Sequence, residues 1–249
     1  MQIIPITTRV LKEGDDLAAI FKSCAEFRAG DIIVVSSKAV ATVEGAMLDL
    51  SKYKPTSEAR KLAVSTGHRS PQFIQAVLEE TERLHGRVTG ACPGALLTEV
   101  KPDGLPHGTI LTANAGLDES NVPEGFAVGW PVEPVSSVKE LQKQLRTALI
   151  LSDSNCRPRR LGVAAFALVC AGLEPLRSEA GKEDLFGKKL HITTEALADQ
   201  LATAANFVMG NAGQSVPAAI IRDHGLPPSD FCGWVPGIEP EEDLFRGII

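Results

Sequence analysis

Apolar residues recur at helical spacing in several segments of the chain, and polar capping residues stand at the ends of these segments. Asp15 or Asp16 can cap a first helix, whose apolar positions are Leu17, Ile20, Phe21, Cys24 and Phe27. A second helix is predicted over residues 57–67. The third has Ser70 as N-cap and Pro71 at its first position, and its apolar stripe comprises Phe73, Ile74, Val77, Leu78 and Leu84.

Further along the chain the same patterns predict two more helices and a set of apolar strands. Ser137 and Glu140 have the spacing of a capping box, which predicts a helix start. Thr193 or Thr194 can cap an Ala-rich helix that ends at Gly210. Continuous apolar runs predict strands over residues 32–37, 148–152, from 162 onward and 216–222, and shorter β-like runs lie at 95–97, 109–112 and 126–128.

This order of elements predicts an α+β protein with mixed or antiparallel sheets, because strands and helices do not alternate regularly. The chain has neither the G-x-x-x-x-G-K-[ST] phosphate-binding motif nor the G-x-G-x-x-G dinucleotide-binding motif. We expect one unit over residues 1–249, with two interleaved α+β subdomains as the alternative. Residues 226–249 are rich in Pro and acidic residues, which predicts an extended arm or loops.

Composition narrows the class of function. The chain of 249 residues carries 25 Lys and Arg against 31 Asp and Glu, a net charge of −6, which argues against a long phosphate-backbone footprint. Only 5% of residues are aromatic, too few for a protein that stacks single-stranded bases. We therefore expect no nucleic-acid partner. The N-terminus has no signal-peptide pattern, and the longest nearly apolar run, residues 161–173, is too short for a membrane span. The five scattered cysteines lack a C-x-x-C pair and favour a reducing cytoplasm.

Two polar segments that follow strand-like runs contain candidate metal ligands. Residues 114–121 combine small side chains with Asp118, a hard oxygen ligand suited to Mg²⁺ or Mn²⁺, although an Asx-rich turn explains the same pattern. Residues 152–160 place Asp153 beside hydroxyls and three arginines, as in a metal–phosphate site or a solvated basic loop. Cys156 lies in this second segment, but no His is fixed near it in sequence, so the case for a cysteine nucleophile is weak.

Two other segments offer groups that bind phosphate. Residues 209–217 are mostly small, so their backbone N–H groups can surround phosphate oxygens, with a helix C-cap as the alternative. Ser36, Ser37 and Lys38 add hydroxyls and an ammonium at the end of the first predicted strand, where a solvent-facing lysine is the alternative. Each signal is weak alone. Loops at strand ends can converge, however, and the combination predicts one metal–nucleotide site.

A series of short motifs covers about residues 10–223 of the chain, in the same order in which one known protein family carries them. The most specific are N-A-G-L-D-E-S-N at 114–121 and S-D-S at 152–154. The others are K-E-G-D-D at 12–16, S-S-K at 36–38, E-G at 44–45, Q-A-V-L-E-E at 75–80, H-G at 107–108, R-P at 157–158, D-L-F-G at 184–187, A-D-Q at 198–200 and residues 209–222. On these motifs the chain resembles the coenzyme F420-0:L-glutamate ligases, the γ-glutamyl ligases of deazaflavin biosynthesis.

The resemblance implies an α+β fold without a P-loop, an intertwined homodimer, and GTP with two divalent cations, Mg²⁺ or Mn²⁺; K⁺ is a further candidate cation. By position, Asp118 and Asp153 would hold one metal and Ser154 a second, with Asn211 at another metal-ligand position of the family. The implied nucleotide-binding residues are Thr8, Arg9, Val10, Leu11, Ser37, Lys38, Thr42, Asn121, Met209, Gly210, Asn211, Ala212, Gly213, Gln214, Ser215 and Val216.

The implied reaction activates the terminal carboxylate of F420-0, or of a related anionic substrate, as an acyl phosphate. The α-amine of L-glutamate then attacks, and the products are an amide, GDP and phosphate. Asp118, Asp153 and Arg157 are the candidate catalytic residues. From charge alone, Arg157 and Arg160 are also candidates to bind substrate carboxylates.

Three positions depart from the family's usual pattern. Thr42 stands where a nucleotide-contacting Lys is common, Asn211 where an acidic or amide metal ligand is common, and Cys156 where Gly is usual. Two alternatives therefore stay open. One is a related ligase with a different carboxylate and amine, and the other is a diverged nucleotide- or metal-binding module without ligase activity.

Overall fold

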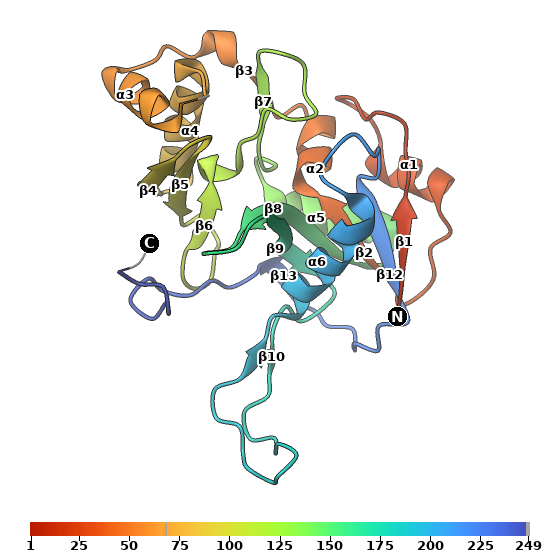
Figure 1. Cartoon of the computed structure of the whole chain (residues 1–249). Coiled ribbons are helices and arrows are strands. Elements are labelled where there is room, and N and C mark those ends of the chain that lie inside the picture. Colours follow the sequence, from red (N-terminus) through yellow and green to blue (C-terminus); the bar gives the residue numbers. More distant parts are fainter. Residues whose placement is uncertain (68, 248–249) are drawn as a thin grey trace.

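The computed structural model describes residues 1–67 and 69–247 and is built around a mixed six-stranded sheet (Figure 1). Within this part of the chain β2 pairs parallel to β8, and the other neighbouring strands of the sheet pair antiparallel. In sheet order the strands are β1 (Gln2–Ile6), β12 (Ala218–Arg222), β2 (Ile32–Ser36), β8 (Ala148–Cys156), β9 (Val163–Ala171) and β13 (Cys232–Trp234).

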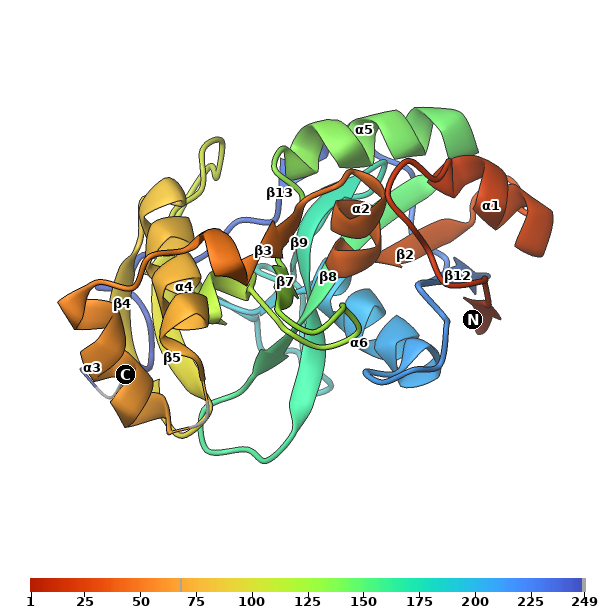
Figure 2. The same cartoon turned by 90° about the horizontal axis from the view of Figure 1, so that it is seen from above.

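Helices cover both faces of this sheet, as Figure 2 shows from above. Helices α1 (Leu17–Cys24) and α5 (Pro134–Leu145) pack on one face, and α6 (Leu197–Met209) packs on the other. In β2, Ile33 and Val35 face the first side while Ile32 and Val34 face α6. Burial on both faces explains why this strand is a continuous apolar run rather than an alternating one.

A second group of elements packs around its own apolar cluster at the left of Figure 1. It contains a three-stranded antiparallel sheet and two helices, α3 and α4, that cover it. These elements are α3 (Ser57–Thr66), α4 (Pro71–Arg83), β4 (Arg87–Cys92), β5 (Ala95–Val100) and β6 (Ile110–Ala113). The short pair β3 (Met47–Asp49) and β7 (Phe126–Val128) and the 3₁₀ turns Leu50–Lys52 and Asn114–Gly116 connect this group to the large sheet.

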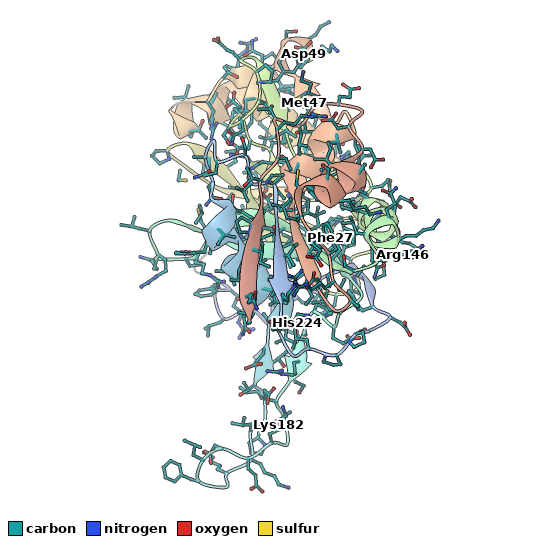
Figure 3. All side chains as sticks on the ribbon, turned by 90° about the vertical axis from the view of Figure 1, so that its right-hand side faces the viewer. Phe27, Met47, Asp49, Arg146, Lys182 and His224 are labelled. Carbon is teal, nitrogen blue, oxygen red and sulfur yellow. The ribbon has the colours of Figure 1, made fainter. Side chains whose placement is uncertain are left out.

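A long hairpin leaves the large sheet after β9. Its paired segments are β10 (Arg177–Ser178) and β11 (Thr194–Glu195), and it projects away from the rest of the chain (Figure 1). Lys182, labelled in Figure 3, lies in this projection, far from the sheet. None of the described helices is long and apolar enough to cross a bilayer.

The α+β class and most predicted elements are confirmed. Asp16 caps α1 by accepting a hydrogen bond from the Ala19 N–H at 2.9 Å, and Ser70 caps α4 with Pro71 at its start. Gly67 ends α3 in the left-handed conformation, and Gly210 ends α6. These signals depend on neighbours within one helical turn, which is why the sequence reveals them.

Other local predictions are wrong. Ser137 does not cap α5; the helix begins at Pro134, and the Ser137 hydroxyl donates to the Glu133 carbonyl. Neither Thr193 nor Thr194 caps α6, whose N-cap is Ala196, because Thr194 belongs to β11. The predicted loop after residue 152 is strand up to residue 156, since β9 supplies a long antiparallel partner.

Several elements were not predicted. Helix α2 (Ser37–Val43) follows β2 directly, and β1 and the hairpin were also missed. Strand β13 lies inside the predicted arm of residues 226–249, of which the structure describes residues up to 247, and the predicted last strand begins at Ala218 rather than 216. Short strands such as β1 and β13 are stabilised by distant partners, so little in their own sequence marks them.

A buried ion pair fastens β12 to the start of β2. The Arg222 guanidinium donates to both oxygens of Asp31 at 2.8 and 2.7 Å, and also to the Glu26 carbonyl at 3.0 Å. Asp31 is 1% exposed. Burial raises the pKa of Asp31, but the hydrogen bonds and charge of Arg222 outweigh burial, so the pKa lies below its ordinary value.

The replacement Arg222→Leu leaves the Asp31 carboxylate buried without its cation, and we expect it to lower the free energy of unfolding at pH 7 by about 3–5 kcal/mol. Urea denaturation measures this. The control is Arg83→Leu, which breaks the exposed 2.7 Å pair with Glu80 and costs about 1 kcal/mol or less. Because the Asp31 pKa is lowered by folding, the deficit should shrink as the pH falls below about 3.9. Equal losses in the two variants would contradict this.

Candidate functional site

The polar segments singled out in the sequence meet around one cavity of about 430 Å³. Among the predicted residues, those that line it are Thr8, Arg9, Val10, Leu11, Lys38, Thr42, Asp118, Asn121, Asp153, Ser154, Met209, Gly210, Asn211, Ala212, Gly213, Ser215 and Val216. The residues come from five separate parts of the chain: 8–11, 38–42, 118–121, 153–154 and 209–216. The sequence predicts that these segments converge, and they lie around this one cavity.

The parallel pairing of β2 with β8 brings the first two segments together. Ser36 at the end of β2 is the register partner of Ser152 in β8. The carboxyl ends of parallel strands lie at the same edge, so Lys38 in α2 and Asp153 in β8 become neighbours. Backbone hydrogen bonds then fix the loop before β12: the Thr8 N–H donates to the Ser215 carbonyl and the Ser36 N–H to the Pro217 carbonyl, both at 2.9 Å.

One ammonium lies between two carboxylates in this cavity. The Lys38 Nζ is 2.9 Å from Asp118 Oδ2 and 3.7 Å from Asp153 Oδ1. Burial raises the pKa of Asp118, but the charge of Lys38 and hydrogen bonds from Ser120 and Lys38 outweigh it and lower the pKa to about 2. For Lys38, burial lowers the pKa, yet the two carboxylates raise it above its ordinary value. Lys38 therefore stays cationic at neutral pH.

Asp118 lies in an Asx turn and at the same time faces the cavity. Its Oδ1 accepts the Ser120 N–H at 3.0 Å, and the Ser120 hydroxyl donates to Oδ2. A backbone bridge to Val128 of β7 holds the turn in place. The two interpretations of this segment, a self-satisfied turn and a ligand-binding loop, are therefore compatible, because the turn orients the carboxylate.

Asp153 is the most enclosed charged group of the cavity, with 7% of its side chain exposed. Its Oδ2 accepts the Trp130 indole N–H at 2.7 Å and its Oδ1 the Ser154 N–H at 2.8 Å. Burial raises the pKa of Asp153 above its ordinary value, although Lys38, Trp130 and the Ser154 N–H oppose the rise. A second cation near Asp153 would favour its ionised form.

The donor set suits a hard divalent cation that also contacts phosphate. Asp118 and Asp153 already share one cationic group, and Ser154 and Asn211 line the same cavity. Mg²⁺ is often held by one or two carboxylates together with substrate phosphates and water. Among the described residues, no three His, Cys, Asp or Glu side chains gather as a metal-binding group.

The chain is similar to known proteins over most of its length. The sequence pattern of the family described as F420-0:Gamma-glutamyl ligase matches residues 5–223. The chain belongs to this family. It is 34% identical over 250 residues to the Coenzyme F420:L-glutamate ligase of Methanopyrus kandleri, an alignment that covers 98% of this chain and 89% of the relative. The proteins of the same name from Archaeoglobus fulgidus and Methanothermobacter thermautotrophicus are 35% and 36% identical, over 86% and 94% of this chain and 83% and 94% of theirs.

Four residues that the sequence suggested for the site do not line the cavity: Ser37, Gln214, Arg157 and Arg160. Ser37 is fully buried, and its hydroxyl has no hydrogen-bond partner among the described residues. The Gln214 side chain folds back and accepts the Ala212 N–H at 2.8 Å, so it shapes the loop from within. Arg157 is exposed at the end of β8, near Asp199. Cys156 is an exposed free thiol outside the lining.

Trp130 contacts the candidate site and was missed by the sequence analysis. It lies between β7 and α5, outside every motif quoted for the family, and nothing local indicates that its N–H reaches Asp153. The contact depends on a left-handed turn in which Asn114, Ala115 and Gly116 have φ values of 53, 52 and 81°. A Cβ on Gly116 would lie 2.5 Å from the Trp130 Nε1. Only glycine leaves room for the indole.

The replacement Gly116→Ala should therefore displace Trp130 from Asp153 as well as strain the backbone. We expect a loss of about 2–5 kcal/mol in the free energy of unfolding, from left-handed strain plus overpacking, and altered tryptophan fluorescence. Gly125→Ala is the matched control, since Gly125 has the same φ of 81° but nothing within 4 Å of the added Cβ. It should cost only about 1–2 kcal/mol and leave the fluorescence unchanged. Equal effects would refute the proposed role of Gly116.

Proposed function

We propose that this protein is a GTP- and divalent-metal-dependent γ-glutamyl ligase that adds L-glutamate to coenzyme F420-0. The observation that carries the proposal is the pair of carboxylates around Lys38 in a cavity lined by segments from distant parts of the chain. Membership of the F420-0:Gamma-glutamyl ligase family supports the substrate, and relatives at 34–36% identity carry the name Coenzyme F420:L-glutamate ligase. A cytoplasmic location is part of the proposal and is supported by the free cysteines.

In this proposal the loops hold the nucleotide and the charged groups hold its phosphates. Residues 8–11, 209–213, 215 and 216 line the cavity together with Thr42 and Asn121. In the proposal these groups bind GTP. Their backbone N–H groups can donate to phosphate oxygens, and Lys38 places a positive charge between the carboxylates. Asp118, Asp153, Ser154 and Asn211 would hold Mg²⁺ or Mn²⁺, which neutralises phosphate charge; K⁺ is a further candidate cation.

The proposed reaction needs no covalent bond between the enzyme and a substrate. An oxygen of the substrate carboxylate attacks the γ-phosphorus of GTP, the bond to the β-phosphate oxygen breaks, and GDP leaves. The uncharged α-amine of L-glutamate then attacks the acyl carbon. A C–N bond forms, the bond to the phosphate oxygen breaks, and phosphate and one proton are released. Like charges must approach in the first step, so positive charge such as that of Lys38 lowers its barrier.

A single assay tests the proposal against its alternatives. The protein is incubated with F420-0, L-glutamate, GTP and Mn²⁺, and product mass and GDP are followed. We expect the mass of F420-0 to increase by one glutamyl residue for each amide bond formed, and one GDP to be released for each bond. GDP release only with another carboxylate and amine would favour a related ligase. Thermal stabilisation by GTP without any turnover would favour a binding module.

Replacing Asp118 with Asn tests the carboxylate pair. We expect Asp118→Asn to lower kcat by about 10²–10³, the usual effect of losing one preorganised electrostatic group, and to weaken Mn²⁺ binding measured by titration calorimetry. Asp49→Asn is a close control: each carboxylate accepts the N–H of a serine two residues later, and each side chain is 29% exposed. Asp49 lies outside the cavity lining. Unchanged Mn²⁺ binding in Asp118→Asn would refute the assignment.

We also propose that the protein forms a homodimer through the projecting hairpin. Leu185, Phe186 and Ile192 on this hairpin are 99, 93 and 92% exposed, an unusual concentration of apolar side chains along an extended segment. The hairpin has few neighbours in its own chain, as its outline in Figure 1 indicates. A second copy of the chain would bury these side chains and hold the hairpin in place.

The double replacement Leu185→Ser/Phe186→Ser should convert the dimer to a monomer at micromolar concentration, because it removes the apolar surface that association would bury. Light scattering coupled to size-exclusion chromatography measures the mass. Val64→Ser on α3, which replaces a side chain that is 82% exposed, is the control and should leave the mass unchanged. A wild-type protein that is monomeric, or a double variant that stays dimeric, would contradict the proposed interface.

A further inference from the structure

A second cavity, of about 420 Å³, lies beyond β9 and is not used by the nucleotide site. Residues from three places line it: strands β4 to β6, strand β9 together with the start of α6, and residues 235–247 of the C-terminal segment. In Figure 1 this segment runs beneath β6 toward the C-terminus. It follows the part of the chain that matches the family pattern, which ends at residue 223.

The C-terminal wall is fastened by close backbone contacts. The Gly237 N–H donates to the His107 carbonyl at 3.0 Å, and the Thr109 N–H donates to the Ile238 carbonyl at 3.2 Å. A Cβ on Gly108 would lie 2.4 Å from the backbone of Gly237. The two chain segments approach this closely only because both residues are glycine. The wall is therefore part of the fold rather than a loosely placed tail.

Side chains of both charges line this cavity and keep hydrogen-bonding capacity free. Asp199 of α6 uses Oδ1 to accept the Ala167 N–H at 2.8 Å, and its Oδ2 has no such partner among the described residues. Arg87 uses Nε and Nη2 to pair with Glu99, which leaves its Nη1. Arg246 adds a second guanidinium and Asn155 an amide oxygen. The lining can hold a ligand that carries both an ammonium and carboxylates.

The two cavities are neighbours. Asp153 in the nucleotide site and Phe166 in the second cavity are register partners in β8 and β9. Along α6, Asp199 lines the second cavity and Asn206 the first. Seven residues of helix separate them by about 10 Å. Asp199 lies on the helix that both cavities share, whereas Arg87 lies on β4, the outer strand of its sheet.

We propose that the second cavity binds the amino-acid substrate, L-glutamate, with its α-amino group at Asp199 and its carboxylates toward Arg87 and Arg246. This inference rests on the proposed ligase function and gives one of its substrates a binding site. The orientation directs the amine toward the nucleotide site, where the acyl phosphate would form, and the carboxylates away from it. The wall formed by residues 235–247 is then part of the amino-acid site.

Steady-state kinetics of two variants test this assignment. Asp199→Asn keeps an oxygen that can accept the Ala167 N–H, so the fold should persist, but it removes the charge that pairs with the amine. We expect KM for L-glutamate to rise about tenfold or more, with KM for GTP and F420-0 within about twofold of wild type. Arg87→Gln should raise the same KM. Asp49→Asn is the control, because this carboxylate also accepts a backbone N–H, at 3.0 Å, and lies outside both cavities.

An unchanged KM for L-glutamate in Asp199→Asn, or a rise in KM for F420-0 alone, would overturn the assignment while leaving the ligase function intact. Titration calorimetry with L-glutamate, with and without GTP, gives a readout that needs no turnover. Binding by the wild type that Asp199→Asn loses would support the site even if the ligase reaction with F420-0 failed. Equal binding by both proteins, or no binding by the wild type, would overturn it.

Discussion

The charge balance around Asp153 is the constraint on which the site depends. A carboxylate with 7% of its side chain exposed is costly unless cations and N–H donors surround it, and Lys38, Trp130 and the Ser154 N–H supply them. Each partner comes from a different part of the chain. The parallel pairing of β2 with β8, the left-handed turn at 114–116 and the close approach of Gly116 to Trp130 are all needed to bring these groups together.

The strand pair β8–β9 and helix α6 connect this charged centre to the second cavity. Asp153 and Ser154 line the first cavity, and Asn155 and Phe166 line the second. A ligase joins two substrates and uses the hydrolysis energy of a nucleotide to do so. It must hold the reacting groups of the two substrates within a few ångströms of each other while the rest of each substrate is bound elsewhere. Two adjacent cavities along one rigid strand pair suit this requirement, because a strand pair with a long hydrogen-bonded register moves little.

Most helices could be predicted from the sequence because their start and stop signals are local. Asp16, Ser70 and Gly67 act within one turn of the helix that they cap or end. The errors arose where distant chain segments decide. Residues 153–156 became strand because β9 pairs with them, and Trp234 entered β13 because the edge of β9 was free to accept it. For the same reason the sequence could suggest Asp118 and Asp153 but not Trp130.

By itself, the sequence determined the α+β class and the family and suggested the residues of the candidate site, since these depend on short patterns and on motif order. Only the tertiary structure decided which of those residues share a cavity. It placed Lys38 between Asp118 and Asp153, turned Ser37 inward, and kept Arg157 out of the lining. The physical reason is that charge neutralisation and close packing join residues far apart in the chain, and no local pattern records which partners will meet.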